Sequence, residues 1–291
     1  MPRPTARTAR PPRIPSLDGG PVYDSAYPEV GVLASLRRVA TNTRLVSLLV
    51  HKELTSRYRR SALGVIWALV TPVLTVLVMW LVFENVLPVA DLGVPYAVYL
   101  ASGILALTAA QQGIIALGSS LQNYESLLSR IHLPAEILAA GSMGAIAVHL
   151  SLATVAVLAL QVLLGVGVPL TALLAPAVLL TLLAFTSGIG MLVAGIALRL
   201  PDVLHLVGIA IYLLGFLTPT FFPISALDDP GRWIVEANPL TGYLELLRGC
   251  LYEGEVGSAA RWIVSVTLGV SMLVAGTASF ARAGRRAVVA G

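Results

Sequence analysis

Charged side chains are scarce in this sequence, and their scarcity restricts the class of protein. Asp, Glu, Lys and Arg make up 12% of the 291 residues, and apolar side chains make up 57%. A soluble globular domain carries roughly 25% charged residues, so a soluble domain is excluded. A disordered chain needs many charges and few apolar residues, and it is excluded as well. What remains is an integral membrane protein.

Cysteine and lysine are nearly absent, which limits the chemistry of the chain. The single cysteine, Cys250, cannot form an internal disulfide or a cysteine metal cluster. The only lysine, Lys52, has no glycine-rich loop before it, so the usual nucleotide-binding loop is missing. The four histidines show no metal-ligand spacing. We therefore expect no catalytic residue, metal or cofactor in this chain.

Six apolar stretches are long enough to cross a bilayer, which takes about 20 residues in a helix. They are too long for transmembrane strands and do not alternate in polarity. None contains Asp, Glu, Lys or Arg, which counts against a proton- or sodium-driven transporter. The predicted fold is an all-α integral membrane protein with six transmembrane helices. They are Ala62–Phe83, Tyr96–Gly118, Ile137–Leu164, Leu170–Leu198, Val203–Phe222 and Trp262–Ala281.

The distribution of Lys and Arg predicts how these spans are oriented. Six spans place both termini on one side. If that side is the cytoplasm, the inner segments hold 11, 1, 1 and 3 basic residues, which is 16, and the outer segments hold 3. This bias predicts cytoplasmic termini, and it explains the basic character without nucleic acid as a partner. The inner segments are 1–61, 119–136, 199–202 and 282–291.

The chain before the first span is predicted to have two parts. Residues 1–40 form a flexible basic tail. Thr41–Arg60 forms a cytoplasmic amphipathic helix in the headgroup plane, because apolar residues recur at four-residue spacing beside basic ones. Thr41 and Asn42 are candidates for its N-cap. This helix either only anchors the chain or also contacts a cytoplasmic partner. The predicted domains are 1–40, 41–61, the transmembrane domain 62–281 and a cytoplasmic tail 282–291.

The inner loop Ser119–Pro134 carries leucines that need cover. Asn123-Tyr124-Glu125 is typical of a helix start, and Leu127 and Leu128 follow it. Exposed leucines in so short a loop must pack against something. The loop either packs on the helix ends of this chain or docks into a groove of another subunit.

The longest outer segment, 223–261, is predicted to hold a short re-entrant or interfacial helix before the last span. Asn238 is its expected N-cap and Pro239 its first helical residue. The helix is too short and too charged to span a bilayer. The acidic residues of this segment have no spacing that favours an enzyme site over a solvated surface.

Several short motifs occur along residues 40–255. They are Lys52-Glu53-Leu54, Arg57-Tyr58-Arg59, Ser61, Leu63-Gly64 with Trp67 and Pro72, the inner loop from Asn123 through Ile131 to Leu138, Thr218-Pro219, Phe221-Phe222-Pro223, and Asn238-Pro239-Leu240-Thr241 with Arg248. As a set they resemble the type-2 ABC exporter permeases, most nearly the branch that exports teichoic acids and O-antigens.

The resemblance implies a function and a set of partners. It implies a permease homodimer in the bacterial cytoplasmic membrane, with membrane lipids around it and two copies of a separate cytoplasmic ATPase subunit that bind ATP and Mg. The implied substrate is a polyprenyl-diphosphate-linked polysaccharide, moved outward. A permease for a drug or lipid and a membrane-bound glycan-processing enzyme are the alternatives.

Four groups of candidate site residues follow. The ATPase-coupling loop comprises Asn123, Tyr124, Glu125, Leu127, Leu128 and Arg130. The interfacial gate helix comprises Lys52, Glu53, Arg57, Tyr58, Arg59 and Arg60. Aromatic faces suit sugar rings, so the candidate channel lining comprises Trp67, Trp80, Phe83, Tyr96, Tyr99, Tyr212 and Phe216, each of which could equally anchor in lipid or pack on a helix. The external re-entrant segment comprises Asn238, Pro239, Tyr243 and Arg248.

Overall fold

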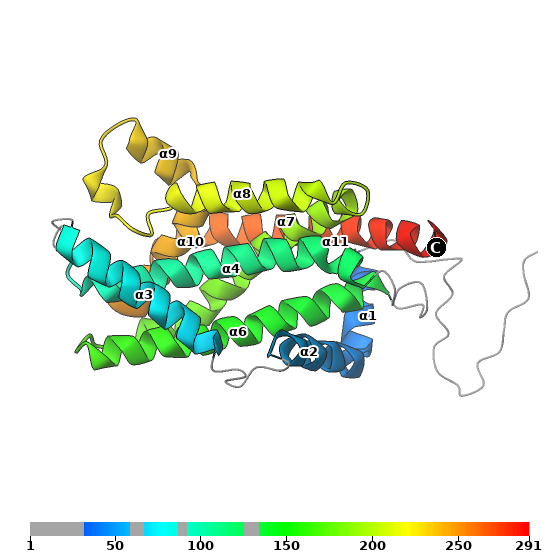
Figure 1. The fold of residues 1–291 in the computed structure, drawn as a ribbon, viewed down its shortest axis with the longest axis horizontal. Helices are drawn as coiled ribbons and strands as arrows, with labels where there is room; N and C mark the ends of the chain where they lie inside the picture. The colour runs from blue at the N-terminus through cyan, green and yellow to red at the C-terminus, as the bar shows by residue number, and fades with distance from the viewer. Residues whose placement is uncertain (1–31, 59–66, 87–91, 125–133, 291) are drawn as a thin grey trace, which may run out of the picture.

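The computed structural model describes residues 32–58, 67–86, 92–124 and 134–290, and every regular element in these ranges is helical. The long helices lie side by side along the long axis of the molecule (Figure 1). In chain order the elements are α1 (Val32–Thr41), α2 (Thr43–Tyr58), α3 (Trp67–Val86), α4 (Tyr96–Asn123), α6 (Ala135–Leu163), η2 (Leu170–Leu174), α7 (Ala175–Ala197), α8 (Asp202–Phe216), η3 (Ile224–Ala226), α9 (Gly231–Ala237), α10 (Pro239–Arg248), η4 (Gly249–Glu253) and α11 (Ala259–Ala290).

Four helical stretches of the described residues are long and apolar enough to cross a membrane. Two shorter apolar helical stretches, Val73–Val82 and Asp202–Phe216, overlap parts of the first and fifth predicted spans. The all-helical membrane class is confirmed, and the count of six spans stays a prediction. The four long stretches are Tyr96–Asn123, Ala135–Leu163, Leu170–Ala197 and Ala259–Gly284.

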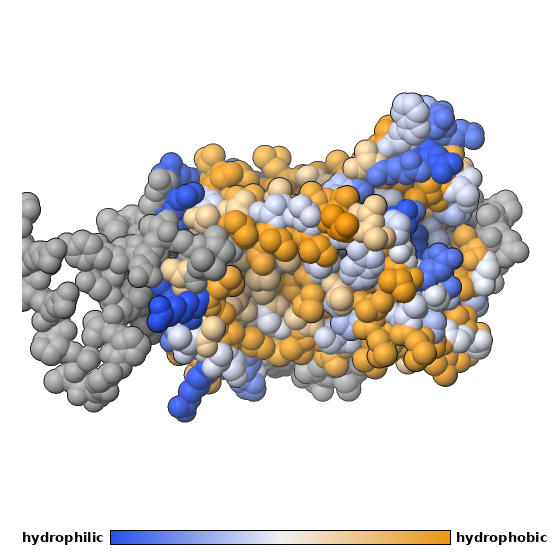
Figure 2. All heavy atoms as spheres, turned by 180° about the vertical axis from the view of Figure 1, so that it is seen from behind, coloured by the Kyte–Doolittle hydropathy of each residue, from blue (hydrophilic) through white to orange (hydrophobic). Residues whose placement is uncertain are grey.

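The two ends of the bundle carry different elements. Helices α1 and α2 and the C-terminal end of α11 lie at one end, and α9 and α10 lie toward the other (Figure 1). On the face seen in Figure 2, hydrophobic side chains cover much of the surface between hydrophilic patches at the two ends. Large apolar side chains such as Leu206, Ile209 and Leu213 of α8 are exposed there or on other faces. Such a surface suits lipid or a partner helix.

Small residues let α4, α7 and α11 approach closely. A Cβ on Gly190 of α7 would lie 2.6 Å from the Ile114 carbonyl oxygen of α4. A Cβ on Gly188, two residues earlier, would overlap the Met272 backbone of α11. Between membrane helices the association comes from such close packing, because lipid supplies no hydrophobic drive. The three helices therefore form the tightly packed centre of the fold.

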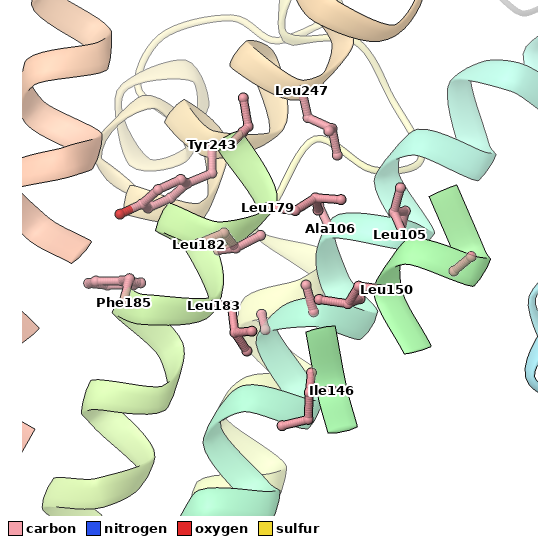
Figure 3. Close-up of a cluster of buried hydrophobic side chains, with 14 of the residues drawn as sticks. Leu105, Ala106, Ile146, Leu150, Leu179, Leu182, Leu183, Phe185, Tyr243 and Leu247 are labelled. Carbon is pink, nitrogen blue, oxygen red and sulfur yellow. The ribbon is translucent and has the colours of Figure 1, made fainter. Parts of the chain in front are cut away.

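Helix α10 belongs to the core rather than to the surface. Tyr243 is fully buried, and its ring centroid lies 5.7 Å from that of Phe185 in α7. The labelled side chains of this buried cluster come from α4, α6, α7 and α10 (Figure 3). They are Leu105, Ala106, Ile146, Leu150, Leu179, Leu182, Leu183, Phe185, Tyr243 and Leu247.

The prediction of a flexible tail up to residue 40 is wrong in its last part, because Val32–Thr41 forms α1. This helix packs against α6 and α11, which a local pattern could not reveal. The next helix begins at Thr43, and the Asn42 carbonyl accepts a bond from Leu45 N, as in an N-cap. The Asn42 side-chain amide, however, donates back to the Arg38 carbonyl. Asn42 thus joins α1 to α2.

Two helix ends also differ from the prediction. Helix α4 runs on to Asn123, whereas the predicted span ended at Gly118, and Tyr124 is its C-cap. The helix runs past Gly118 because Leu121 and Tyr124 are buried against the core. The predicted helix start at Asn123-Tyr124-Glu125 concerns residues 125–133, which lie outside the described residues. Helix α8 ends at Phe216, whereas the predicted span reached Phe222. The carbonyls beyond α8 bond to tyrosines of α4, as described below.

Candidate functional site

The interfacial helix α2 meets the end of α4 at one carboxylate. Glu53 Oε1 accepts hydrogen bonds from Tyr124 Oη at 2.9 Å and from Ser142 Oγ of α6 at 3.1 Å. Lys52 Nζ lies 4.3 Å from the centroid of the Tyr124 ring. Two residues expected in the gate helix therefore contact a residue expected in the coupling loop.

Tyr124 keeps its proton in this arrangement. Burial raises the pKa of the Tyr124 phenol above its ordinary value, and the hydrogen bond and negative charge of Glu53 raise it further. The phenol therefore remains a donor throughout the physiological pH range. A hydrogen bond from a neutral donor to an ionised acceptor is stronger than one between two neutral groups.

A second carboxylate lies at the start of α6. Glu136 is buried, and its Oε1 accepts a bond from Ser35 Oγ at 3.0 Å and forms an ion pair with Arg38 Nη1 at 3.2 Å. Both partners belong to α1. We call Ser35, Arg38, Glu53, Tyr124, Glu136 and Ser142 the N-terminal junction.

Apart from these bonds, two glycines of α6 form part of the contact with α2. An added Cβ on Gly141 would lie 2.6 Å from Leu49 Cβ, and one on Gly144 would lie 2.6 Å from Val50 Cγ2. The two glycines thus allow α2 to cross α6 at short range. None of the described side chains of α2 is fully buried, so the polar bonds of Glu53 add to the close contact of Leu49 and Val50 in fixing its position.

At the opposite end of the bundle, Asn238 joins α8 to α10. Its Oδ1 accepts a bond from Leu240 N at 3.0 Å, which confirms the predicted N-cap with Pro239 as the first helical residue. Its Nδ2 donates to Thr218 Oγ1 at 2.9 Å. Tyr243 Oη donates to the Ser265 carbonyl of α11 at 2.6 Å. The expected re-entrant segment is therefore fixed on two sides.

Arg248, the last residue of α10, is a buried cation with neutral partners. It is 5% exposed, and its Nε donates to Ser102 Oγ at 3.3 Å. Its Cζ lies 3.6 Å from the centroid of the Tyr99 ring, which is a cation–π geometry. The ion pairs among the described residues are Arg38–Glu136, Arg232–Glu236 and Arg261–Glu245, so Arg248 has none there.

Two tyrosines of α4 hold the chain that follows α8. Tyr99 Oη donates to the Phe222 carbonyl at 2.7 Å, with the Pro219 carbonyl at 2.9 Å. Tyr96 Oη donates to the Phe221 carbonyl at 2.7 Å. We call Tyr96, Tyr99, Ser102, Asn238 and Arg248 the α10 junction.

The expected channel-lining aromatics divide into buried and exposed groups. Tyr96 and Tyr99 are buried in the core of this chain, and Trp80 is half-buried against it. Trp67, Tyr212 and Phe216 are exposed, and the last two contact each other edge to face at 5.1 Å. The structure does not describe the side chain of Phe83.

Some expected site residues lie outside what the structure describes. The coupling-loop residues Glu125, Leu127, Leu128 and Arg130 and the gate-helix residues Arg59 and Arg60 lie in undescribed segments. Arg57 and Tyr58 close α2, with their side chains undescribed. Among the described side chains, no three His, Cys, Asp or Glu gather as a metal site requires.

The sequence interpretation missed Ser35, Arg38 and Ser142 altogether, and it named Glu136 only within a motif. An acidic residue in the first turn of a helix is already explained by its favourable interaction with the helix dipole. The position of Glu136 in the sequence therefore gave no sign of a distant partner. Ser35 is 101 positions away from Glu136 in the chain, and only an aligned set of relatives could have linked them.

Residues 44–252 match the ABC-2 type transporter family. The chain is similar to the O-antigen export system permease protein RfbA of Myxococcus xanthus, with 26% identity over 238 residues, which cover 81% of this chain and 91% of that protein. It is also similar to two proteins of the same name from Klebsiella pneumoniae. Each is 22% identical, over 81% of this chain and 90% of the relative.

Proposed function

Since the chain belongs to the ABC-2 type transporter family, we propose that it is the permease subunit of an ABC exporter for a polyprenyl-diphosphate-linked polysaccharide, such as an O-antigen, a teichoic acid or a related cell-envelope glycan. The observation that carries this proposal is the similarity to permeases named for O-antigen export, which extends over 81% of the chain. Transport is outward across the bacterial cytoplasmic membrane. The chain itself is a transport subunit and not an enzyme.

The proposed topology has six spans with both termini in the cytoplasm. The 16 to 3 distribution of basic residues supports it. The arrangement of the helices agrees, because α1, α2 and the C-terminal end of α11 share one end of the bundle (Figure 1). Helices α3 and α8, whose apolar stretches are the shorter ones, are the first and fifth spans.

The proposed energy source is a separate ATPase subunit, present in two copies, which binds ATP and Mg. The sequence of this chain contains no phosphate-binding loop of the usual kind. The loop after Tyr124 is the proposed docking element, and its leucines are the proposed contacts. Two copies of the permease would enclose the conduit between them, on a two-fold axis.

The proposed route of the glycan uses exposed aromatic side chains. Tyr212 is 60% exposed, and its ring makes an edge-to-face contact with the ring of Phe216, one turn further along α8. Such faces can stack against sugar rings. Trp67 at the start of α3 is a further candidate, whereas the Tyr96 and Tyr99 hydroxyls already bond to backbone carbonyls within this chain.

Deletion and complementation in the host test this function. Without the chain, lipid-linked glycan should accumulate on the inner side and disappear from the cell surface, and the intact gene should restore it. An unchanged surface glycan with altered resistance to a drug would favour a drug permease. Purified chain that modifies lipid-linked glycan without ATP would favour a glycan-processing enzyme.

A further inference from the structure

At each end of the segment 125–133, which is itself outside the described residues, a carboxylate takes part in a bond to the N-terminal helices. Before it, Tyr124 donates to Glu53 of α2 at 2.9 Å. After it, Glu136 accepts from Ser35 at 3.0 Å and pairs with Arg38 at 3.2 Å, both in α1. Each end of the segment is therefore bonded to one helix of the N-terminal pair.

We propose that Glu53 and Glu136 are positioning residues that make α1, α2 and the two ends of this segment move as one body. The inference rests on the proposed function, in which an ATPase docks on the segment and α2 lies at the substrate entrance. Movement imposed by the ATPase would then reach α2 through these carboxylates.

The packing around the helix pair supports this role. Among the described side chains of α1 and α2, only Ser35 is buried, and Leu36, Leu45 and Leu48 are exposed. Apolar burial within this chain therefore fixes the pair only weakly. Across the contact with α6, Leu49 and Val50 of α2 lie against Gly141 and Gly144, which supply no side chains of their own. The directional bonds of Glu53 add to this close contact in fixing where α2 sits along α6.

The chemistry of the bonds explains why carboxylates occupy both places. One oxygen of Glu53 accepts from two hydroxyls, Tyr124 and Ser142. An ionised acceptor strengthens both bonds, and Gln would keep the shape but lose this strength. The Tyr124 ring also lies under Lys52, so a displaced Tyr124 would carry α2 with it by a second contact.

Hydrogen exchange measures the attachment independently of any substrate. The purified chain in lipid nanodiscs would be compared with the double variant Glu53→Gln/Glu136→Gln. We expect the α1 and α2 amides to exchange at least fivefold faster in the variant, with exchange in α7 unchanged. The control Glu255→Gln neutralises an exposed carboxylate outside the junction and should change neither. Unchanged exchange in α1 and α2 of the double variant would overturn the inference.

Transport then tests whether the attachment carries coupling. In the complex with its ATPase, the double variant should hydrolyse ATP within twofold of the wild-type rate but export at least tenfold less glycan per ATP. Tyr124→Phe should give an intermediate loss. Equal export per ATP in the double variant and the wild type would overturn the inference. A wild-type complex that exports no glycan would instead contradict the proposed function, and the exchange result would still decide whether the helices are attached.

Discussion

Replacing Gly188 of α7 by alanine should destabilise the bundle at its centre. A Cβ at this position would overlap the Met272 carbonyl group of α11 and lie 2.6 Å from Leu273 N. These are backbone atoms, so no side chain can rotate away. To reach an ordinary contact of about 3.5 Å, the two helices must separate by about 1 Å.

The size of the effect follows from known costs of overpacking. Inserting a methyl group into a well-packed core costs about 1–3 kcal/mol, which lowers the folding equilibrium constant by about 5- to 150-fold. Gly276 faces the same contact, since its Cβ would lie 2.8 Å from the Gly188 Cα. Gly276→Ala should therefore have a comparable effect, and the double variant should cost less than the sum because both substitutions force apart the same contact.

Thermal unfolding of the purified chain in detergent, followed by the loss of its monodisperse chromatographic peak, measures this effect. We expect Gly188→Ala to lower the Tm by about 2–10 °C. Gly167→Ala is the matched control, because nothing lies within 4 Å of its added Cβ. A Gly188 variant as stable as the Gly167 variant would refute the close approach of α7 and α11.

Three further predictions concern topology, the α10 junction and the substrate entrance. Asp228→Cys should react with a membrane-impermeant thiol reagent added from outside, and Arg282→Cys only after the membrane is permeabilised. The reverse pattern would refute the topology. Tyr99→Phe should cost about 1–3 kcal/mol in unfolding free energy, because it removes the donor to the buried Pro219 carbonyl and the part-buried Phe222 carbonyl after α8; an unchanged Tm would contradict this. Replacing both Arg57 and Arg59 by lysine should keep insertion and assembly but slow export, because lysine cannot bind phosphate oxygens in pairs; wild-type export would mean that the arginines only anchor the chain.

Features encoded by neighbouring residues could be predicted from the sequence. The long apolar stretches match α4, α6, α7 and α11, since absence of charge over 20 or more residues needs no distant partner. The N-cap at Asn238 is confirmed, and it could be predicted because the capping oxygen and Leu240 N lie within three residues of each other.

Features that depend on distant contacts could not be predicted. Local patterns predict a flexible tail where α1 forms. They do not reveal the helix, because its bonds reach Glu136, about a third of the chain away. The extension of α4 past Gly118 to Asn123 depends on the burial of Leu121 and Tyr124 against the core, which no local pattern reveals. The roles of Tyr96 and Tyr99 as donors to the chain after α8 likewise depend on partners more than 100 residues away. Periodicity and turn signals contain no information about such pairs.

The two junctions hold their helices by different means, and this difference predicts where the chain yields first. Seven side chains of α10 are buried, and the turn after it is fixed by bonds from Gln161 to Leu251 O and from Thr171 to Cys250 O. The α1–α2 pair has little apolar burial of its own and relies on two carboxylates. Segments with few buried contacts open at lower free energy than the core. Amides of α2 should therefore exchange before those of α10, so the end of the bundle that carries the proposed ATPase contacts is the end that can move.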